Sequence, residues 1–571
     1  MKTKLSLKMF FTLAFFNVSV VGFSQSAKWL WDEGFGGAKS ESVAGMSKDG
    51  NGNIYITGTY SSASFYFGGY EVLDTLLRSF FVAKINPEGV VQWAKTDGGY
   101  GGDTIYISPG PTAIVNDAAG NTYITGGFQT DTLVIGNYTM TKSPAGSNTS
   151  NIFVAEYDTA GNVVWAEALG GSSVALPNAM ALDASGNVYI TGDFSSDSIT
   201  FGGTTLYNNG YGNSLTVKLS STGQVIWARS ASGPAGIDLF DGTDVTSVAM
   251  TTSPEHGIYI TGFIQSDSVS FGNYTLVNPL GGALVFVTKY DTAGNVLWSV
   301  AAGNDSSVQY AYGITADAAA NIYVTGSYHG RTTQFGNTVL ANAGYGDGND
   351  IFLVKYNPAG EVQWATRAGG NALDEAYGVA AGNNGDLYLT GFSWSRPFII
   401  GHDTFDVVSS DGSAAFVAKY DTAGNEQWAK FAYSYENITT LSVVPDNEGS
   451  AYITGYYLGT YMLFDSAQLI NAGNTGLTSD IFVAKAGPAV ANGIKELSGE
   501  PVLTLYPNPS TGKVFVEGLP VHSMVYLYDL AGRLLFSEQT VSSPVTIDVS
   551  GLSPGMYIVQ TEGGSGKVVK M

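Results

Sequence analysis

A repeat of 64 to 70 residues constrains the fold of this chain more than any other feature, because a fixed period of this length sets the architecture. Three markers recur in one order: a tyrosine in an apolar-Tyr-apolar-Thr-Gly strand, a strand that usually reads Phe-Val-Ala-Lys, and a tryptophan. The tyrosines are Tyr55, Tyr123, Tyr189, Tyr259, Tyr323, Tyr388 and Tyr452. The strands of the Phe-Val-Ala-Lys type have their first marker residue at Phe81, Phe153, Leu215, Phe286, Phe352, Phe416 and Phe482. The tryptophans are Trp31, Trp93, Trp165, Trp227, Trp298, Trp364 and Trp428.

Short turns of one pattern separate the markers, such as Asp117-Ala118-Ala119-Gly120-Asn121 before a tyrosine strand. Loops of this length with a late glycine join antiparallel neighbours, so each repeat is predicted to be a four-stranded sheet. Its first strand is rich in small residues, as in 376–381, and its last strand carries the tryptophan. This size gradient suits blades that converge at an axis and diverge at a rim, which favours a β-propeller over a linear solenoid.

The two ends of the repeat region complement each other. Trp31 marks a fourth strand without three strands before it, and the last repeat ends after Phe482 without a tryptophan strand. We expect residues around 29–33 to complete the last sheet and leave no strand edge at the seam. The predicted fold is all-β, a seven-bladed β-propeller of four-stranded antiparallel blades with 1+3 closure over residues 25–487.

These markers resemble the seven-bladed beta-propeller (SBBP) repeat of bacterial exported proteins. The resemblance covers roughly residues 27–487. It departs from the pattern locally, because Glu156 replaces the usual lysine and Leu215 replaces phenylalanine. The resemblance implies a propeller fold and export, and it carries no information on a ligand.

The first residues have the pattern of a secretory signal peptide, predicted at 1–24. Three lysines precede an uncharged run from Met9 to Phe23 and then small residues. This run is shorter than the roughly 20 residues of a membrane-spanning helix, and no later stretch approaches that length, so no membrane-spanning segment is predicted. The formal charge of −23 disfavours nucleic acid as a partner. Since the chain has no cysteine, disulfides and thiolate-bound zinc are excluded.

A segment of different character follows a predicted linker at 488–501. Alternating strands and glycine or proline turns predict a small β-sandwich at 502–571. Its motifs resemble the type A sorting domain of the type IX secretion system. They are Tyr506-Pro507-Asn508-Pro509, a strand containing Gly555 and Tyr557, and a terminal strand with Lys567 and Lys570. The resemblance implies that this machinery and a sortase are partners, and that the protein is released or held on the outer surface of a Gram-negative bacterium.

No catalytic constellation stands out in the sequence, and no catalytic residue or cofactor is predicted. The four histidines do not lie at metal-ligand spacing, and no Gly-x-Ser-x-Gly elbow is present. The loop at 49–53 spaces oxygen atoms as a calcium loop does but lacks the downstream bidentate glutamate, which leaves calcium as an open alternative. Asp374 and Glu375 could form a glycosidase pair, but we interpret them as solvated loop acids.

Residues outside the repeat register are the candidate ligand contacts. The long connections between tyrosine and phenylalanine strands are expected to share one face with the links between blades, and loops on a rigid scaffold are common binding sites. These connections contain Tyr207, Tyr211, Trp394 and Arg396. An exposed tryptophan beside an arginine suits glycan stacking or a protein hot spot.

The sequence therefore favours a secreted or cell-surface, non-catalytic binding or adhesion protein that presents a loop-rich acidic face to a glycan or protein. Two alternatives stay open: a propeller enzyme acting on polysaccharide, and a structural surface protein without a specific ligand. Propeller enzymes usually break repeat symmetry with clustered His, Arg or acidic residues near the axis, whereas these repeats are regular and histidine is scarce.

Overall fold

The computed structural model describes most of the chain, in two compact units that divide at residue 489. The described residues are 27–73, 79–100, 110–142, 150–170, 174–208, 212–233, 244–278, 282–303, 308–344, 348–406, 412–465, 467–473, 477–488, 504–517, 523–528, 534–539, 544–561 and 564–571. Their regular structure consists of strands, which confirms the all-β prediction. No helix within these ranges has the length and apolar character to cross a membrane. The predicted signal peptide, and the predicted linker beyond Pro488, lie outside the described residues.

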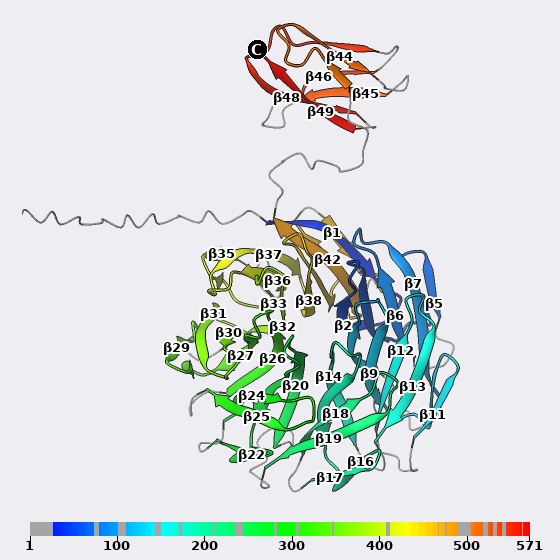
Figure 1. The fold of residues 1–571 in the computed structure, drawn as a ribbon, viewed down its shortest axis with the longest axis vertical. Helices are drawn as coiled ribbons and strands as arrows, with labels where there is room; N and C mark the ends of the chain where they lie inside the picture. Colours follow the sequence, from blue (N-terminus) through cyan, green and yellow to red (C-terminus); the bar gives the residue numbers. More distant parts are fainter. Residues whose placement is uncertain are drawn as a thin grey trace, which may run out of the picture. The chain divides into compact units, whose positions relative to one another are not determined.

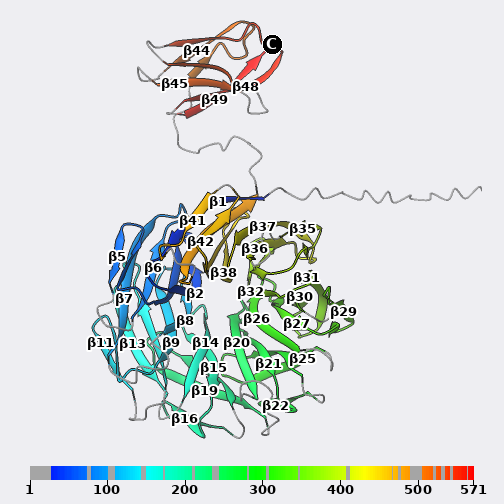
Figure 2. The same cartoon turned by 180° about the vertical axis from the view of Figure 1, so that it is seen from behind.

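The first unit is propeller-like, with sheets that radiate from a common axis (Figures 1 and 2). In each sheet four antiparallel strands follow one another outward from the axis. The first strands are β2 (Glu41–Lys48), β8 (Gly110–Asn116), β14 (Ala175–Leu182), β20 (Val245–Thr252), β26 (Val308–Ala316), β32 (Asp374–Ala381) and β38 (Ile438–Pro445). The second strands, which carry the marker tyrosines, are β3 (Ile54–Tyr60), β9 (Thr122–Phe128), β15 (Val188–Phe194), β21 (Ile258–Ile264), β27 (Ile322–His329), β33 (Leu387–Ser393) and β39 (Ala451–Tyr457).

The outer two strands of each sheet carry the other markers. The third strands are β6 (Ser79–Ile85), β12 (Asn151–Tyr157), β18 (Asn213–Leu219), β24 (Leu284–Tyr290), β30 (Asn349–Tyr356), β36 (Ser413–Tyr420) and β42 (Asp480–Pro488). The tryptophan strands are β7 (Val91–Tyr100), β13 (Val163–Leu169), β19 (Val225–Ser232), β25 (Val296–Ala302), β31 (Val362–Gly369), β37 (Glu426–Ser434) and β1 (Ala27–Phe35).

The marker tyrosine and lysine of a repeat contact each other within a sheet. Lys84 Nζ lies 5.1 Å from the ring centroid of Tyr55, a cation–π distance. The Tyr55 hydroxyl donates a hydrogen bond to Asp49, in the turn before its own strand, at 3.1 Å. Similar lysine contacts are made by Tyr189, Tyr259, Tyr323, Tyr388 and Tyr452. The recurring Asp, Tyr and Lys therefore stabilise one local arrangement.

The marker tryptophan joins neighbouring sheets. Trp93 Nε1 donates a hydrogen bond to the Thr159 carbonyl of the next sheet's turn at 3.2 Å. Gly161 in that turn has a φ of +79°, and a Cβ there would lie 3.1 Å from the Trp93 ring. Glycine is needed both for this backbone conformation and for the close approach of the ring. The turn glycines and the tryptophans thus recur together because they touch across sheet boundaries.

The first described strand lies beside the last strand of the unit. β1 pairs antiparallel with β42, and both views show the two strands side by side (Figures 1 and 2). Trp31 of β1 donates to the Pro87 carbonyl at 3.2 Å, in the turn between β6 and β7. Each first strand contacts the first strand of the next sheet, and β38 contacts β2. Residues from the two ends of the unit therefore share one core.

Hairpins occupy the long connections between second and third strands. They are β4 (Ser64–Phe67) with β5 (Tyr70–Leu73), β10 (Thr132–Ile135) with β11 (Tyr138–Thr141), β16 (Ser198–Phe201) with β17 (Thr204–Tyr207), β22 (Ser268–Phe271) with β23 (Tyr274–Val277), β28 (Thr332–Phe335) with β29 (Thr338–Ala341), β34 (Phe398–Ile400) with β35 (Asp403–Phe405), and β40 (Tyr461–Phe464) with β41 (Ala467–Ile470). Several pair with the tryptophan strand of the preceding sheet, as β10 does with β7. Their phenylalanines, including Phe67, Phe201 and Phe335, are buried. These hairpins therefore pack on the core and cover sheet edges, and their phenylalanine rings are not available to a ligand.

The second unit contains two sheets around one apolar core. The first sheet has β43 (Thr504–Tyr506), β44 (Lys513–Glu517) and β47 (Val545–Asp548). The second has β45 (Met524–Tyr528), β46 (Leu534–Gln539), β48 (Gly555–Thr561) and β49 (Gly564–Lys570). Val514 and Ile547 of one sheet and Val525 and Val559 of the other are buried in a single cluster.

Candidate functional site

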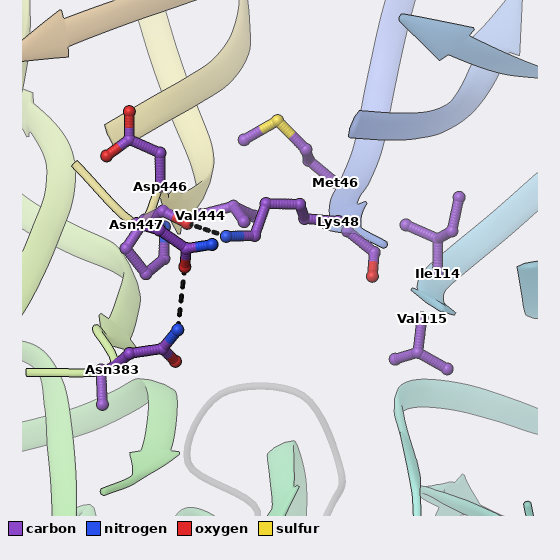
Figure 3. Close-up of a pocket in the computed structure, with 11 residues that line it drawn as sticks. Met46, Lys48, Ile114, Val115, Asn383, Val444, Asp446 and Asn447 are labelled. Carbon is purple, nitrogen blue, oxygen red and sulfur yellow. Dashed lines mark hydrogen bonds between the residues drawn. The ribbon is translucent and has the colours of Figure 1, made fainter. Parts of the chain in front are cut away.

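A cavity of ≈360 Å³ opens where β2, β8, β32 and β38 end near the axis (Figure 3). Lys48 Nζ donates to the Pro445 carbonyl at 2.5 Å, and Asn383 Nδ2 donates to Asn447 at 2.8 Å. Burial lowers the pKa of Lys48. The remaining wall is largely apolar, with Met46, Ile114, Val115 and Val444 among its side chains. The lysine and the amides are thus already engaged, and the carboxylate of Asp446, which also lines the cavity, forms an ion pair with Lys485 at 2.8 Å.

A row of aromatic side chains lies on β21, β26, β32 and β33 and on the segment after β33. Rings follow one another across the sheets of β20, β26 and β32, with successive centroids 4.8, 6.3, 4.7, 6.0 and 6.4 Å apart. This aromatic row consists of Phe263, Tyr310, Tyr312, Tyr377, Phe392 and Trp394. The tyrosines are half-buried, and Trp394 at the end of the row is 42% exposed. The row is therefore accessible at its tyrosines and at Trp394, whereas Phe263 and Phe392 are buried.

Glu375 lies against the aromatic row. Its Oε2 accepts a hydrogen bond from the Tyr377 hydroxyl at 2.6 Å. Its Oε1 accepts from Asn349 Nδ2 at 3.1 Å and from Ser327 Oγ at 3.5 Å. Burial, followed by the Glu375 charge, raises the pKa of Tyr377. Tyr377 therefore keeps its proton at physiological pH and remains a donor to the carboxylate.

The aromatic row breaks the repeat at a defined position. Every first strand has a β-bulge, and the bulged residues are Ala44, Thr112, Asn178, Val248, Tyr312, Tyr377 and Leu441. Only the strands β26 and β32 place a tyrosine there. Because the other first strands place non-aromatic side chains at this position, the packing of the repeat does not require the two tyrosines. The two tyrosines do not stand out in the sequence, because the first strands are rich in small residues.

The interpretation of Asp374 and Glu375 as solvated loop acids is wrong. Both lie in β32, with Asp374 fully buried and Glu375 half-buried. Asp374 accepts hydrogen bonds from Ser393 Oγ at 2.5 Å, Ser395 Oγ at 2.6 Å and the Gly370 amide at 2.8 Å. Asp374 therefore fixes the loop before β32 and the segment after β33, where Trp394 lies.

The predicted ligand contacts are not brought together. Trp394 and Arg396 share one segment, in which the Trp394 amide donates to the Leu373 carbonyl at 3.0 Å and the Arg396 amide to Asn371 at 3.0 Å. Tyr207 is exposed but ends β17, a hairpin strand that contacts β19 in another sheet. Tyr211 lies outside the described residues. Trp394 alone belongs to the aromatic row.

The loop at 49–53, whose spacing suggested calcium, is a turn held by hydrogen bonds to Asp49. Asp49 Oδ1 accepts hydrogen bonds from the Asn51 and Asn53 amides at 2.9 Å, and Oδ2 accepts from Asn53 Nδ2 at 2.8 Å. The same arrangement recurs in turns beginning at Asp158, Asp183, Asp291, Asp317 and Asp421. The described residues contain no group of three His, Asp or Glu side chains placed to hold a metal ion. The spacing that suggested calcium is therefore explained by the turn.

Two buried carboxylates should make the stability of the first unit depend on pH. Burial raises the pKa of Asp374 to about 7 and that of Asp480 to about 7. Because the folded state binds these protons more tightly than the unfolded chain, their stabilising effect is complete below about pH 4 and is lost as pH rises to about 7.

We expect Asp480→Asn to flatten this dependence. The difference in unfolding free energy between pH 4.5 and 7.5, measured by denaturant titration, should shrink by a few kcal/mol, with ~4 as the upper bound set by the shift. Glu71→Gln, at an exposed position of β5, is the matched control and should leave the difference unchanged. Equal pH dependence in Asp480→Asn and the unsubstituted protein would contradict this assignment.

The opening motif of the second unit is hydrogen-bonded to the end of the chain. Asn508 Oδ1 accepts from the Val569 amide at 2.8 Å, and Nδ2 donates to the Lys567 carbonyl at 2.5 Å. The Tyr506 ring lies 5.6 Å from Phe515, Pro507 and Pro509 are exposed, and Lys570 Nζ donates to the Met571 carbonyl at 2.7 Å. Gly555 begins β48, and the Tyr557 hydroxyl donates to the Ser553 carbonyl at 2.7 Å. Two motifs about 60 residues apart thus form one structural feature.

These features define an all-β chain with a propeller-like unit and a separate C-terminal sorting unit. Residues 504–571 match the family model of the secretion system C-terminal sorting domain. This match confirms the prediction of a sorting domain. The chain is accordingly a cargo of the type IX secretion system, exported to the cell surface or secreted.

The chain is also similar to two proteins of known sequence and to a solved WD40 domain. A WD repeat-containing protein of Acanthamoeba polyphaga mimivirus is 24% identical over 517 residues, covering 76% of this chain and 36% of the relative. The regulatory protein FlaEY of Caulobacter vibrioides is 33% identical over 149 residues, or 26% of this chain and 15% of that protein. The chain thus spans about a third or less of these relatives. Among solved structures, the WD40 domain of Neurospora crassa Pan2 has 7% identity and a TM-score of 0.38, with 82% of this chain and 97% of the domain covered.

Proposed function

We propose that this cargo is a seven-bladed, 1+3-closed β-propeller of the SBBP type with a type A sorting domain. The predicted boundaries are a signal peptide at 1–24, the propeller at 25–487, a linker at 488–501 and the sorting domain at 502–571. The recurrence of three markers, the pairing of β1 with β42 and the contact between β38 and β2 support seven blades and ring closure. Recognition by the sorting machinery and cleavage by a sortase follow from the type A resemblance.

The exported propeller serves binding or adhesion and presents its loop-rich acidic face to a glycan or protein. The observation that carries this proposal is the aromatic row, because the repeat does not require it and it ends at exposed Trp394. Exposed aromatic rings on a rigid scaffold provide large contact areas at low entropic cost. Arg396 shares the segment of Trp394 but donates to the Gly412 carbonyl at 3.5 Å, whereas Tyr207 and Tyr211 are separate candidate contacts.

Substitution of Trp394 tests the binding proposal. A glycan array and a pull-down of surface proteins, both with the exported protein, should identify a ligand whose affinity falls at least about tenfold in Trp394→Ala. Tyr66→Ala removes a ring that is more exposed than Trp394, from the hairpin strand β4, and should not change binding. Unchanged affinity for every ligand in Trp394→Ala, with an unchanged melting curve, would refute the proposal. Turnover in a parallel polysaccharide activity screen would instead favour an enzyme.

A further inference from the structure

We infer that Glu375, Tyr312 and Tyr377 form a binding site for a cationic side chain, an arginine presented by a protein partner. This inference rests on the proposed binding function and names the chemistry of its ligand. The site lies at the bulges of β26 and β32, in the part of the aromatic row nearest the axis.

The first argument is the charge of Glu375. Its carboxylate accepts hydrogen bonds from a phenol, an amide and a hydroxyl, all of which are neutral. Among the described residues no lysine or arginine forms an ion pair with it. A carboxylate offers about four acceptor positions, so one remains for an incoming donor. A half-buried negative charge with neutral partners strongly favours a cation at that position.

The second argument is the arrangement of the rings. Tyr312 and Tyr377 lie 4.7 Å apart with an interplanar angle of 34°, on neighbouring first strands. Aromatic faces attract cations, and the planar guanidinium of arginine stacks on them while it donates to a carboxylate. Elsewhere this protein already uses the interaction: Arg229 lies 5.4 Å from the Trp227 ring centroid. No described lysine or arginine covers Tyr312 or Tyr377 in this way.

The third argument distinguishes a basic peptide from a neutral glycan. The chain carries a formal charge of −23, so a positively charged partner is attracted over long range and its association is faster. A neutral sugar could stack on the tyrosines, but the negative charge of the protein does not attract it. The charge and the position of Glu375 therefore favour arginine.

Titration calorimetry with full-length mature protein tests the inference. The probes are a nonapeptide containing three arginines, the same peptide with citrulline, which is neutral and similar in shape, and chitohexaose. We expect the arginine peptide to bind and the citrulline peptide to bind at least about tenfold more weakly. Glu375→Gln and Tyr312→Leu should each weaken arginine binding about tenfold, whereas Glu71→Gln, with the same charge change on exposed β5, should not.

Three outcomes would overturn the inference. Equal binding of the two peptides to the unsubstituted protein would remove the role of charge, and this comparison needs no variant to fold. Equal weakening by Glu375→Gln and Glu71→Gln would mean that the overall charge of the protein is responsible. Binding of chitohexaose that is lost in Tyr312→Leu, without binding of the arginine peptide, would overturn arginine as the ligand while leaving the proposed binding function intact.

Discussion

A chain that begins at residue 36, without β1, should melt on the order of 10 °C below a chain that begins at residue 25. Loss of β1 exposes the edge of β42, because β1 pairs with β42 from Ala27 to Phe35. It also removes Trp29, whose ring packs 4.8 Å from Phe464, and Trp31, which lies 5.8 Å from Tyr452. Truncation of a single packed tryptophan costs about 3–5 kcal/mol, and here two are lost with a strand. Differential scanning calorimetry measures the effect.

Point substitutions in β1 separate ring packing from the length of the chain. Trp31→Ala should lower the melting temperature clearly, because it also removes the hydrogen bond to Pro87 and the contact with Gly89. Leu30→Ala is the matched control, since Leu30 is 37% exposed and, unlike Trp29 and Trp31, is not among the residues packed on the neighbouring core clusters. If the shortened chain melted at the same temperature as the longer one, β1 would not close the ring.

The repeat markers predict the fold well because they contact one another. Tyrosine, lysine and aspartate meet within a sheet, and tryptophan meets a turn glycine across a boundary. Each contact requires particular residue types at a fixed spacing, so the same residues recur in every repeat of the sequence. The order of the strands and the all-β fold can be predicted from this recurrence.

The aromatic row could not be predicted in the same way. Tyr312 and Tyr377 are neighbours only because a bulge displaces each strand by one residue and because two sheets converge at the axis. Neither effect leaves a periodic pattern. The available signal was an exception to the repeat, namely large rings at a position where the other first strands carry alanine, threonine, asparagine, valine or leucine. The sequence did indicate Trp394, because this residue lies outside the repeat register. Tyr207 also lies outside the register, but it does not belong to the aromatic row.

The buried acids illustrate a second limit of sequence reasoning. Asp374 stands next to Glu375, yet the two alternate across β32 and serve different roles. Asp374 accepts hydrogen bonds from Ser393 and Ser395, which only the pairing of β32 with β33 brings close. Adjacent acids in a sequence therefore do not indicate a catalytic pair or a solvated loop until the strand register is known.

Loss of the second unit should abolish release of the protein across the outer membrane. In a host with the type IX machinery, a chain ending at residue 489 should remain in the periplasm, while the full chain appears at the surface or in the medium. The first unit keeps its own core and should still fold, so the truncated protein should accumulate with an unchanged melting temperature. Immunoblots of cell fractions measure the distribution.

A single substitution in the sorting unit should reproduce much of this effect. Asn508→Ala removes both hydrogen bonds that join the opening motif to the terminal strand, at a cost of about 1–3 kcal/mol. If the export machinery recognises the two motifs as one surface, less protein should reach the medium. Gln560→Ala, at an exposed position of β48, is the control and should be exported normally. Normal export of Asn508→Ala would show that the terminal strand alone is recognised, and normal export of the truncated chain would exclude the second unit as the signal.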